Sequence, residues 1–142
     1  MNMIRIIAGG KKNVGWVAEA CAEYEKRLRK PFDTEWQFVE EGRLEEAVLR
    51  CDDRDFVILL DERGQMWDSP TLSKKLAGGL EAGKRVVLVI GGAYGFSEEI
   101  RKKYVLWSLS KLVFPHQICR LLVAEQIYRA QEIYLGHPYH HD

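Results

Sequence analysis

Residues 86–97 read Val86-Val87-Leu88-Val89-Ile90-Gly91-Gly92-Ala93-Tyr94-Gly95-Phe96-Ser97. Five apolar residues in a row are typical of a parallel strand that is covered on both faces. The run ends at two glycines, where a backbone without Cβ atoms lets a ligand approach closely. Ligands of parallel sheets bind beside the carboxyl ends of the strands, so this turn is the first candidate for a functional site. The alternative is a tight turn that binds nothing.

The rest of the chain alternates between strand and helix patterns. We expect strands at 3–8, 34–40, 56–60, 85–90 and 105–108, with helices at 14–30, 43–51, 69–82 and 118–135 and another that opens at Ser97. Residues 61–68 are predicted to form a polar loop, after which Ser69 supplies an N-cap and Pro70 stands in the first turn. This order predicts an α/β fold with a mostly parallel sheet flanked by helices. We expect one domain over residues 1–142, since 142 residues with 46% hydrophobic content suit a single core.

Composition excludes several classes of protein. Lys plus Arg and Asp plus Glu number 21 each, whereas a nonspecific nucleic-acid binder is usually more basic. Cys21, Cys51 and Cys119 lie far apart, which indicates neither a disulfide framework nor a zinc site. No apolar run approaches the roughly 18 residues that cross a bilayer, and the amino terminus is too short for a signal peptide. We therefore expect a cytoplasmic protein without membrane contact.

The last predicted helix has apolar residues along two stripes. At 100° per residue the two sets are Leu121, Ala124, Tyr128 and Leu135, and Val123, Ile127, Ala130 and Tyr134. A surface helix needs only one apolar stripe, so the second one predicts a further partner, for which a two-fold mate is an obvious candidate. The alternative is that both stripes are buried within one chain.

Residues 108–116 read Ser108-Leu109-Ser110-Lys111-Leu112-Val113-Phe114-Pro115-His116. This segment follows a strand yet stays largely apolar, although loops over a surface are normally polar. An apolar loop that faces a glycine turn can hold an adenine by backbone amides and aliphatic contact, and the alternative is a buried crossover. Neither the dinucleotide spacing G-x-G-x-x-G nor a phosphate-binding G-x-x-x-x-G-K-[ST] is present.

Five motifs follow one another along the chain. They are Leu60-Asp61, Ile90-Gly91-Gly92-x-x-Gly95-x-Ser97, Trp107-Ser108-Leu109-Ser110-x-x-x-x-Pro115-His116, Arg120-x-x-x-x-Glu125-Gln126-x-Tyr128-Arg129-Ala130 and Pro138-Tyr139-His140. Taken in order, they resemble the motifs of the bacterial ribosomal RNA large-subunit methyltransferase H family, small members of the SPOUT class of knotted methyltransferases. The resemblance covers the whole chain and is densest from Phe56 onward.

The resemblance implies a SPOUT-type α/β fold with a C-terminal trefoil knot, an exception to the rule against knots. It implies a homodimer that binds S-adenosyl-L-methionine in the knot. The expected reaction is methylation of N3 of pseudouridine 1915 of 23S ribosomal RNA in the assembled ribosome. By position, the cofactor-binding residues would be Leu60, Gly91, Leu109, Ser110, Lys111, Leu112, Val113 and Phe114.

Four residues are candidates for the chemistry, because N3 of pseudouridine must lose a proton before it attacks a methyl group. His116 is a candidate base, or else a hydrogen-bonding partner of the backbone. Arg120 can stabilise imide or phosphate charge, or pair with Glu125 of a neighbouring copy. Tyr139 and His140 lie in a tail too polar to pack a core, which favours a substrate-facing role over a frayed terminus.

Three histidines and an aspartate in the tail also allow a metal site, but methyl transfer requires no metal and we expect none. Departures from the family lie at Glu41-Gly42-Arg43, a shorter connection than in many relatives, at Ala93-Tyr94, and at the terminal His141-Asp142. Two rival functions stay open. One is a SPOUT methyltransferase for another RNA such as transfer RNA, and the other is a noncatalytic ribosome-associated module.

Overall fold

The computed structural model describes residues 3–92 and 94–141. Five parallel strands form one sheet in the order β2-β1-β4-β3-β5. The strands are β1 (Ile4–Gly9), β2 (Thr34–Val39), β3 (Asp55–Met66), β4 (Arg85–Ile90) and β5 (Val105–Ser108). The helices are α1 (Gly15–Glu25), α2 (Leu44–Leu49), α3 (Ser69–Glu81), α4 (Glu98–Lys103) and α5 (His116–Leu135), and a 3₁₀ turn, η1 (Glu41–Arg43), precedes α2.

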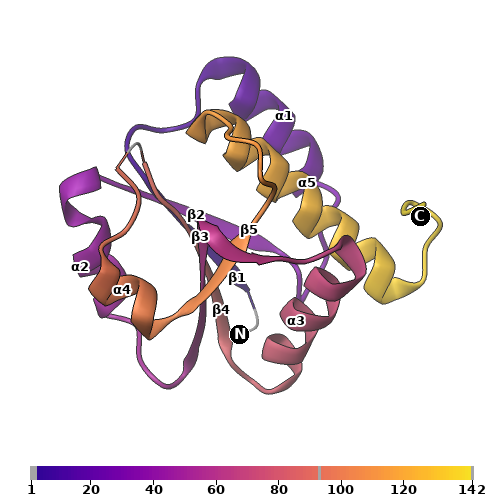
Figure 1. The fold of residues 1–142 in the computed structure, drawn as a ribbon. Coiled ribbons are helices and arrows are strands. Elements are labelled where there is room, and N and C mark those ends of the chain that lie inside the picture. Colours follow the sequence, from indigo (N-terminus) through magenta and orange to yellow (C-terminus); the bar gives the residue numbers. More distant parts are fainter. Residues whose placement is uncertain (1–2, 93, 142) are drawn as a thin grey trace.

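The sheet is the middle of three layers, as Figure 1 shows, with α1, α3 and α5 on one face and α2 and α4 on the other. Side chains alternate between the two faces along each strand. In β4, Val86, Leu88 and Ile90 face α3 and α5, whereas Val87 and Val89 face α2 and α4. The predicted α/β architecture is therefore confirmed. The trefoil knot stays a prediction.

β3 is longer than its apolar run suggests. Residues 61–66, expected as a loop, continue the strand and pair with β5 a second time after a shift in register. A Cβ atom on Gly64 would lie 2.5 Å from backbone atoms of Leu106 and Trp107, so only glycine allows β3 to cross β5 this closely. The polar residues of this extension are mostly exposed, which is why their pattern resembles a loop.

Helix boundaries show which capping signals were correct. The Ser97 hydroxyl accepts a hydrogen bond from the Ile100 amide and caps α4, as predicted. The N-cap of α3 is Asp68 rather than Ser69, because the Asp68 carboxylate accepts the Thr71 amide at 2.8 Å. α1 ends at Glu25, five residues before the predicted end.

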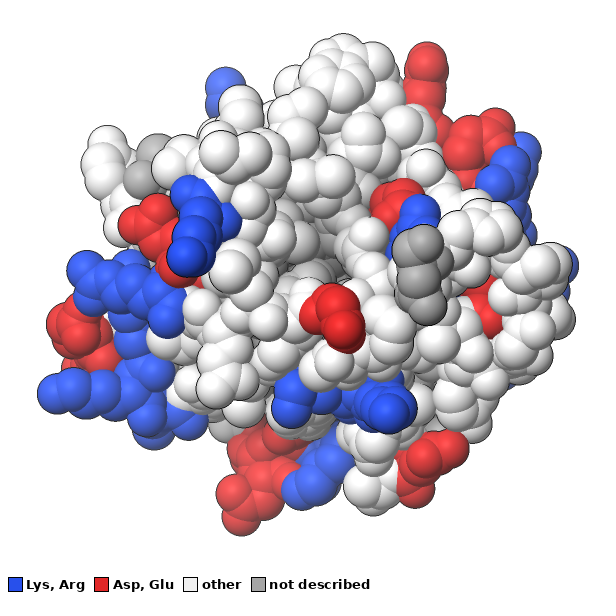
Figure 2. All heavy atoms as spheres, turned by 45° about the vertical axis from the view of Figure 1, so that its right-hand side comes forward, with Lys and Arg blue, Asp and Glu red and all other residues white. Residues whose placement is uncertain are grey.

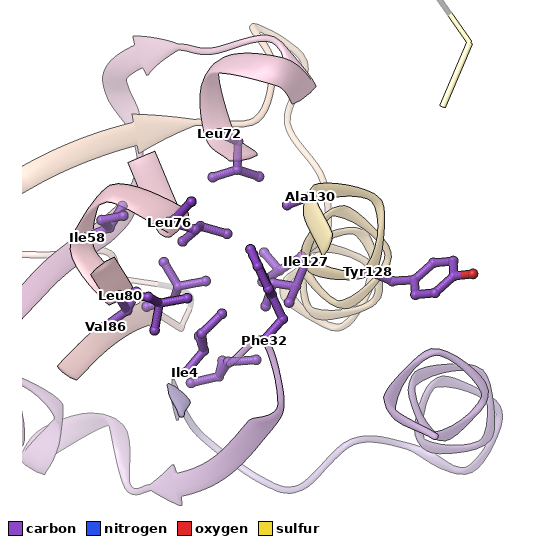
Figure 3. Close-up of a cluster of buried hydrophobic side chains, with 14 of the residues drawn as sticks. Ile4, Phe32, Ile58, Leu72, Leu76, Leu80, Val86, Ile127, Tyr128 and Ala130 are labelled. Carbon is purple, nitrogen blue, oxygen red and sulfur yellow. The ribbon is translucent and has the colours of Figure 1, made fainter. Parts of the chain in front are cut away.

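Helix α5 lies between α1 and α3, and each neighbour covers one of its apolar stripes. Figure 3 shows Ile127 and Ala130 directed towards the cluster around Phe32 and Leu72, while Tyr128 points away from that cluster. Much of both stripes is thus buried within one chain, and the inference that the second stripe requires another copy is wrong. Only the C-terminal residues of the stripes, Tyr134 and Leu135, are well exposed.

Two further expectations concern metals and membranes. Within the described ranges, no three His, Cys, Asp or Glu side chains are placed to hold a metal ion, and Asp142 of the histidine-rich tail lies outside them. None of the helices in these ranges combines the length and the apolar character needed to cross a membrane.

On the face drawn in Figure 2, positive and negative side chains lie side by side around a broad uncharged area.

Candidate active site

A cavity of about 480 Å³ opens beside the carboxyl ends of β4 and β5 and the middle of β3, at residues 60–62. Its size falls within the range of small-molecule and cofactor sites. Two loops contribute most of its wall, with residues 91, 92 and 94–96 after β4 and residues 109, 110 and 112–115 after β5. The cavity therefore lies where the glycine turn and the apolar loop were predicted to meet.

Most of the predicted cofactor-binding residues line this cavity. They are Leu60, Gly91, Leu109, Ser110, Leu112, Val113 and Phe114. Lys111 is the exception, since it is exposed and does not line the wall. A role of Lys111 in holding the cofactor stays a prediction.

The loop after β4, called the glycine loop below, contacts acidic side chains of η1 and α2. The Glu45 carboxylate accepts hydrogen bonds from the Ser97 amide at 2.7 Å and the Ser97 hydroxyl at 2.8 Å. A Cβ atom on Gly92 would overlap the Glu41 carboxylate. Phe96 is buried against the α2 and α4 layer, so the loop is fastened at its C-terminal end. Gly95, in between, has a φ of 67°.

An ion pair between a largely covered arginine and a buried aspartate closes one side of the cavity. Arg101 donates its Nε proton to Asp61 at 2.7 Å, and the two side chains are 16% and 2% exposed. The hydrogen bond to Asp61 raises the pKa of the Arg101 guanidinium. Arg101 also bonds to Glu98, which pairs with Arg63. Sequence reasoning missed Arg101, whose position on a short charged helix gives no sign of burial.

The loop after β5 is apolar without being buried. The Ser110 hydroxyl accepts the Leu112 amide at 3.0 Å, and the Ser108 hydroxyl donates to the Ser110 carbonyl at 2.9 Å. These bonds fix a turn that leaves Leu112 and Val113 72% and 84% exposed. The loop is thus no buried crossover, and its exposed apolar rim surrounds the cavity mouth.

His116 is the first residue of α5, and its exposed side chain lines the cavity. Cys119 follows one turn later, also in the wall, and burial raises the pKa of its thiol. Of the four residues predicted for chemistry, His116 alone lines the cavity.

Comparison with known proteins identifies the family of this chain. The family model described as predicted SPOUT methyltransferase matches residues 1–140. The ribosomal RNA large subunit methyltransferase H of Methylobacillus flagellatus is 38% identical, over 98% of this chain and 99% of the relative. The protein of the same name from Pelobacter propionicus is 38% identical, over 97% and 99%. The chain belongs to the ribosomal RNA large-subunit methyltransferase H family of SPOUT methyltransferases.

Solved structures support the fold of this SPOUT methyltransferase. A probable methylase family protein from Haemophilus influenzae Rd KW20 aligns with a TM-score of 0.54 and 16% identity, over 94% of this chain and 66% of that one. The A. aeolicus TrmH/SpoU tRNA modifying enzyme aligns with a TM-score of 0.55 and 11% identity, over 99% and 82%. At these identities the likeness concerns the fold alone.

Arg120 of the methyltransferase has a different position from the one expected. It is fully buried and donates to the Gly9 carbonyl at 3.0 Å, the Lys11 carbonyl at 2.6 Å and Asn13 Oδ1 at 3.2 Å. Its guanidinium also lies over the Phe38 ring. These contacts assign Arg120 to the loop after β1, and its expected action on imide or phosphate charge stays a prediction. No bond to Glu125 of another copy is needed to explain it.

The tail of the methyltransferase is ordered on the outer face of α5 instead of fraying. The Tyr139 hydroxyl donates to Glu125 at 2.8 Å, the Tyr139 ring packs edge-on against Tyr128, and His140 Nδ1 lies 3.1 Å from Arg129 Nη1. Burial, followed by the bond to Glu125, raises the pKa of the Tyr139 phenol. Neither tail residue lines the cavity of its own chain.

Proposed function

We propose that this chain transfers a methyl group from S-adenosyl-L-methionine to large-subunit ribosomal RNA, at N3 of pseudouridine 1915 of 23S RNA, on assembled ribosomes in the cytoplasm. The observation that carries the proposal is the cavity, whose wall contains seven of the eight residues expected to hold the cofactor. Relatives named ribosomal RNA large subunit methyltransferase H, which align over nearly their whole length, supply the RNA class.

The cavity has the chemistry that this cofactor needs. Leu60, Leu109 and Phe114 provide apolar contact for an adenine ring, and the backbone of Gly91 and Gly92 leaves space beside them. A Cβ atom on Gly91 would lie 3.3 Å from the buried Phe96 ring, so a larger residue there would disturb the wall. When bound, the cofactor supplies a methyl group on a sulfonium, which makes that carbon electrophilic.

The contribution of the protein is to position the nucleotide and to remove its proton. Orientation of the two reactants in line can account for up to about 7–11 kcal/mol of the barrier. His116 stands at the cavity wall with an exposed imidazole, whose unprotonated ring nitrogen is the acceptor proposed for the N3 proton. The ion pair of Asp61 and Arg101 holds the middle of β3 against α4 and so keeps the wall in place.

We also propose a homodimer, in which the tail of one copy serves the cavity of the other. Tyr139 and His140 are fastened near Glu125 and Arg129. Arg129 lies about 20 Å along α5 from His116 at 1.5 Å per residue. If the tail residues act on substrate, the cavity concerned therefore belongs to a second copy. A two-fold axis would satisfy both sites at once.

The decisive test is transfer of tritiated methyl groups to ribosomes that lack the modification, followed by mapping of the labelled nucleotide. Transfer to N3 of the pseudouridine supports the proposal. Transfer to naked transfer RNA in its place would support the rival RNA substrate. A calorimetric titration with S-adenosylmethionine that gives no heat, without competition by S-adenosylhomocysteine, would support the noncatalytic alternative.

The base is tested with two histidine variants of matched exposure. His116→Ala is expected to lower turnover on ribosomes about 10²-fold or more, as removal of a general base does. His137→Ala is the control, since His137 is exposed, contacts Glu132 and lies away from the cavity wall. Equal turnover for His116→Ala and His137→Ala would exclude His116 as the base.

The shared site is tested by complementation between His116→Ala and Tyr139→Ala. Each variant alone should be impaired at both sites of its dimer. An equal mixture, exchanged through unfolding and refolding, should regain about a quarter of wild-type activity, because half of the dimers then have one intact site. Activity no higher than that of either parent would argue against sites shared between copies.

A further inference from the structure

The loop between β1 and α1 carries two lysines that the proposed reaction does not use. β1 ends at Gly9, Gly10 has a φ of 109°, and Lys11 and Lys12 follow, both exposed. In the part of the chain that the structure describes, neither lysine forms an ion pair with a carboxylate. Two adjacent cations are thus presented to solvent on a short loop.

Two side chains of α5 hold the main chain of this loop. Gln117 Oε1 accepts the Val14 amide at 3.0 Å, and Gln117 Nε2 donates to the Lys12 carbonyl at 3.5 Å. Arg120 donates to the carbonyls of Gly9 and Lys11. The loop backbone is therefore fastened at several points while both lysine side chains stay outside.

Arg120 adds a charge that lacks a counter-ion. It is 0% exposed, and within residues 3–92 and 94–141 no carboxylate pairs with it. Its Nε is buried without a hydrogen-bond partner. Buried charges in proteins are normally paired. Three positive charges are thus close together. Lys11 and Lys12 carry two of them in the loop, and Arg120 carries the third directly beneath it.

Each end of the loop lies next to residues that line the cavity or adjoin its wall. A Cβ atom on Gly9 would lie 3.5 Å from the amide nitrogen of Gly92, which lines the cavity. At the other end, Gln117 directly follows His116, the proposed base. In Figure 1 this loop lies beside the loops after β4 and β5. An anionic chain whose base entered the cavity would thus pass close to the two lysines.

We propose that the loop of residues 10–13 binds the RNA backbone, with Lys11 and Lys12 contacting phosphates and Arg120 and Gln117 acting as positioning residues that fix the loop. This inference rests on the proposed function for the identity of the anion. Phosphates are its natural ligands, since lysine contacts with phosphates supply much of the affinity of nucleic-acid complexes. The formal net charge of zero is compatible with this role, because the cations are concentrated where they are used.

The test compares Lys11→Gln/Lys12→Gln with Lys102→Gln/Lys103→Gln, two exposed neighbouring lysines at the C-terminal end of α4. Binding to purified 23S ribosomal RNA is measured by filter retention between about 50 and 300 mM KCl. Log K falls as log salt rises, and loss of two contacts to unpaired RNA should make this slope shallower by about 1.4. If variant and wild type bind equally at a 1 M reference, the variant then binds about 25-fold more weakly at 0.1 M. The α4 control should bind as the wild type does.

Gln117→Ala tests the positioning role without a change of charge. It should weaken RNA binding several-fold while the salt slope stays that of the wild type, since both lysines remain. Affinity for S-adenosylmethionine should be unchanged in all three variants, which shows that the cavity is intact.

The outcomes separate this inference from the proposed function. If the wild type methylates ribosomes but Lys11→Gln/Lys12→Gln binds RNA with the wild-type slope, the loop proposal is wrong and the proposed function stands. If the wild type binds RNA through the loop but methylates nothing, the proposed function fails alone. A change in sedimentation of the free double variant, with RNA binding unaltered, would mean that the loop contacts a second copy and would overturn the proposal.

Discussion

Gly64→Ala should destabilise the protein more than its small size suggests. The added Cβ atom would lie 2.5 Å from Leu106 C and Trp107 N and 2.6 Å from Leu106 O. Ordinary contacts begin near 3.4 Å, so β5 would have to move away by about 0.9 Å. All three atoms belong to the backbone, and a change of side-chain rotamer therefore cannot relieve the overlap.

Overpacking of a core costs about 1–3 kcal/mol, and a clash with backbone belongs at the upper end. For a chain of this length, about 3 kcal/mol lowers Tm by about 10 °C. The assay is thermal and urea unfolding at one fixed protein concentration, since a dimer would make Tm depend on concentration. Residues 60–62 of β3 and Ser108 at the end of β5 line the cavity, so cofactor affinity should fall as well.

Gly78→Ala is the matched control. Gly78 is exposed in the last turn of α3, and a Cβ atom there would meet nothing within 4 Å. Alanine is about 0.8–1.0 kcal/mol better than glycine inside a helix, so this variant should be more stable than the wild type. A Gly64→Ala protein that unfolds at the wild-type temperature would refute the close crossing of β3 and β5.

Three further predictions concern the cavity and the tail. S-adenosylmethionine at ten times its Kd should slow alkylation of Cys119 by iodoacetamide about tenfold and leave Cys51 unaffected, because only Cys119 lines the cavity; equal protection of both thiols would place the cofactor elsewhere. Glu45→Ala removes both acceptors of Ser97 and should weaken cofactor binding several-fold in calorimetry, whereas an unchanged Kd would show that the glycine loop holds itself. The raised pKa of Tyr139 means that folding favours the neutral phenol, so its contribution is complete below the ordinary pKa near 10 and is lost as pH rises above it. Between pH 9 and 11 the free energy of unfolding, measured by urea titration at each pH, should fall more for the wild type than for Tyr139→Phe. Equal decreases in the two proteins would contradict this reasoning.

The layers and most strands of the fold were predictable because local pattern determines them. A run such as Val86–Ile90 can only be a buried strand in so small a chain, and Ser97 had an unambiguous role as a cap. The extension of β3 beyond Leu60 could not be read from its residues. Its polar side chains face solvent, and its pairing with β5 depends on a distant glycine contact.

The site was predictable where main chain forms it and much less so where side chains do. Loops that line the cavity follow strands at one edge of the sheet, which topology alone brings together. The burial of Arg120 could not be read from the sequence, because the surroundings of a side chain on α5 depend on which helices cover it. Its helical spacing from His116 carries no such information. The contact of Tyr139 with Glu125 depends on how the chain turns back after α5 ends at Leu135.

The strand order has a consequence for how the chain folds. β4 lies between β1 and β3, so the centre of the sheet cannot close before residue 90 has been synthesised. Until then β3 has no hydrogen-bonded neighbour, and β1 has an open edge. Pairings this distant in sequence slow folding and expose strand edges to other chains. Nascent chains that stall before β4 should therefore be the species that aggregates.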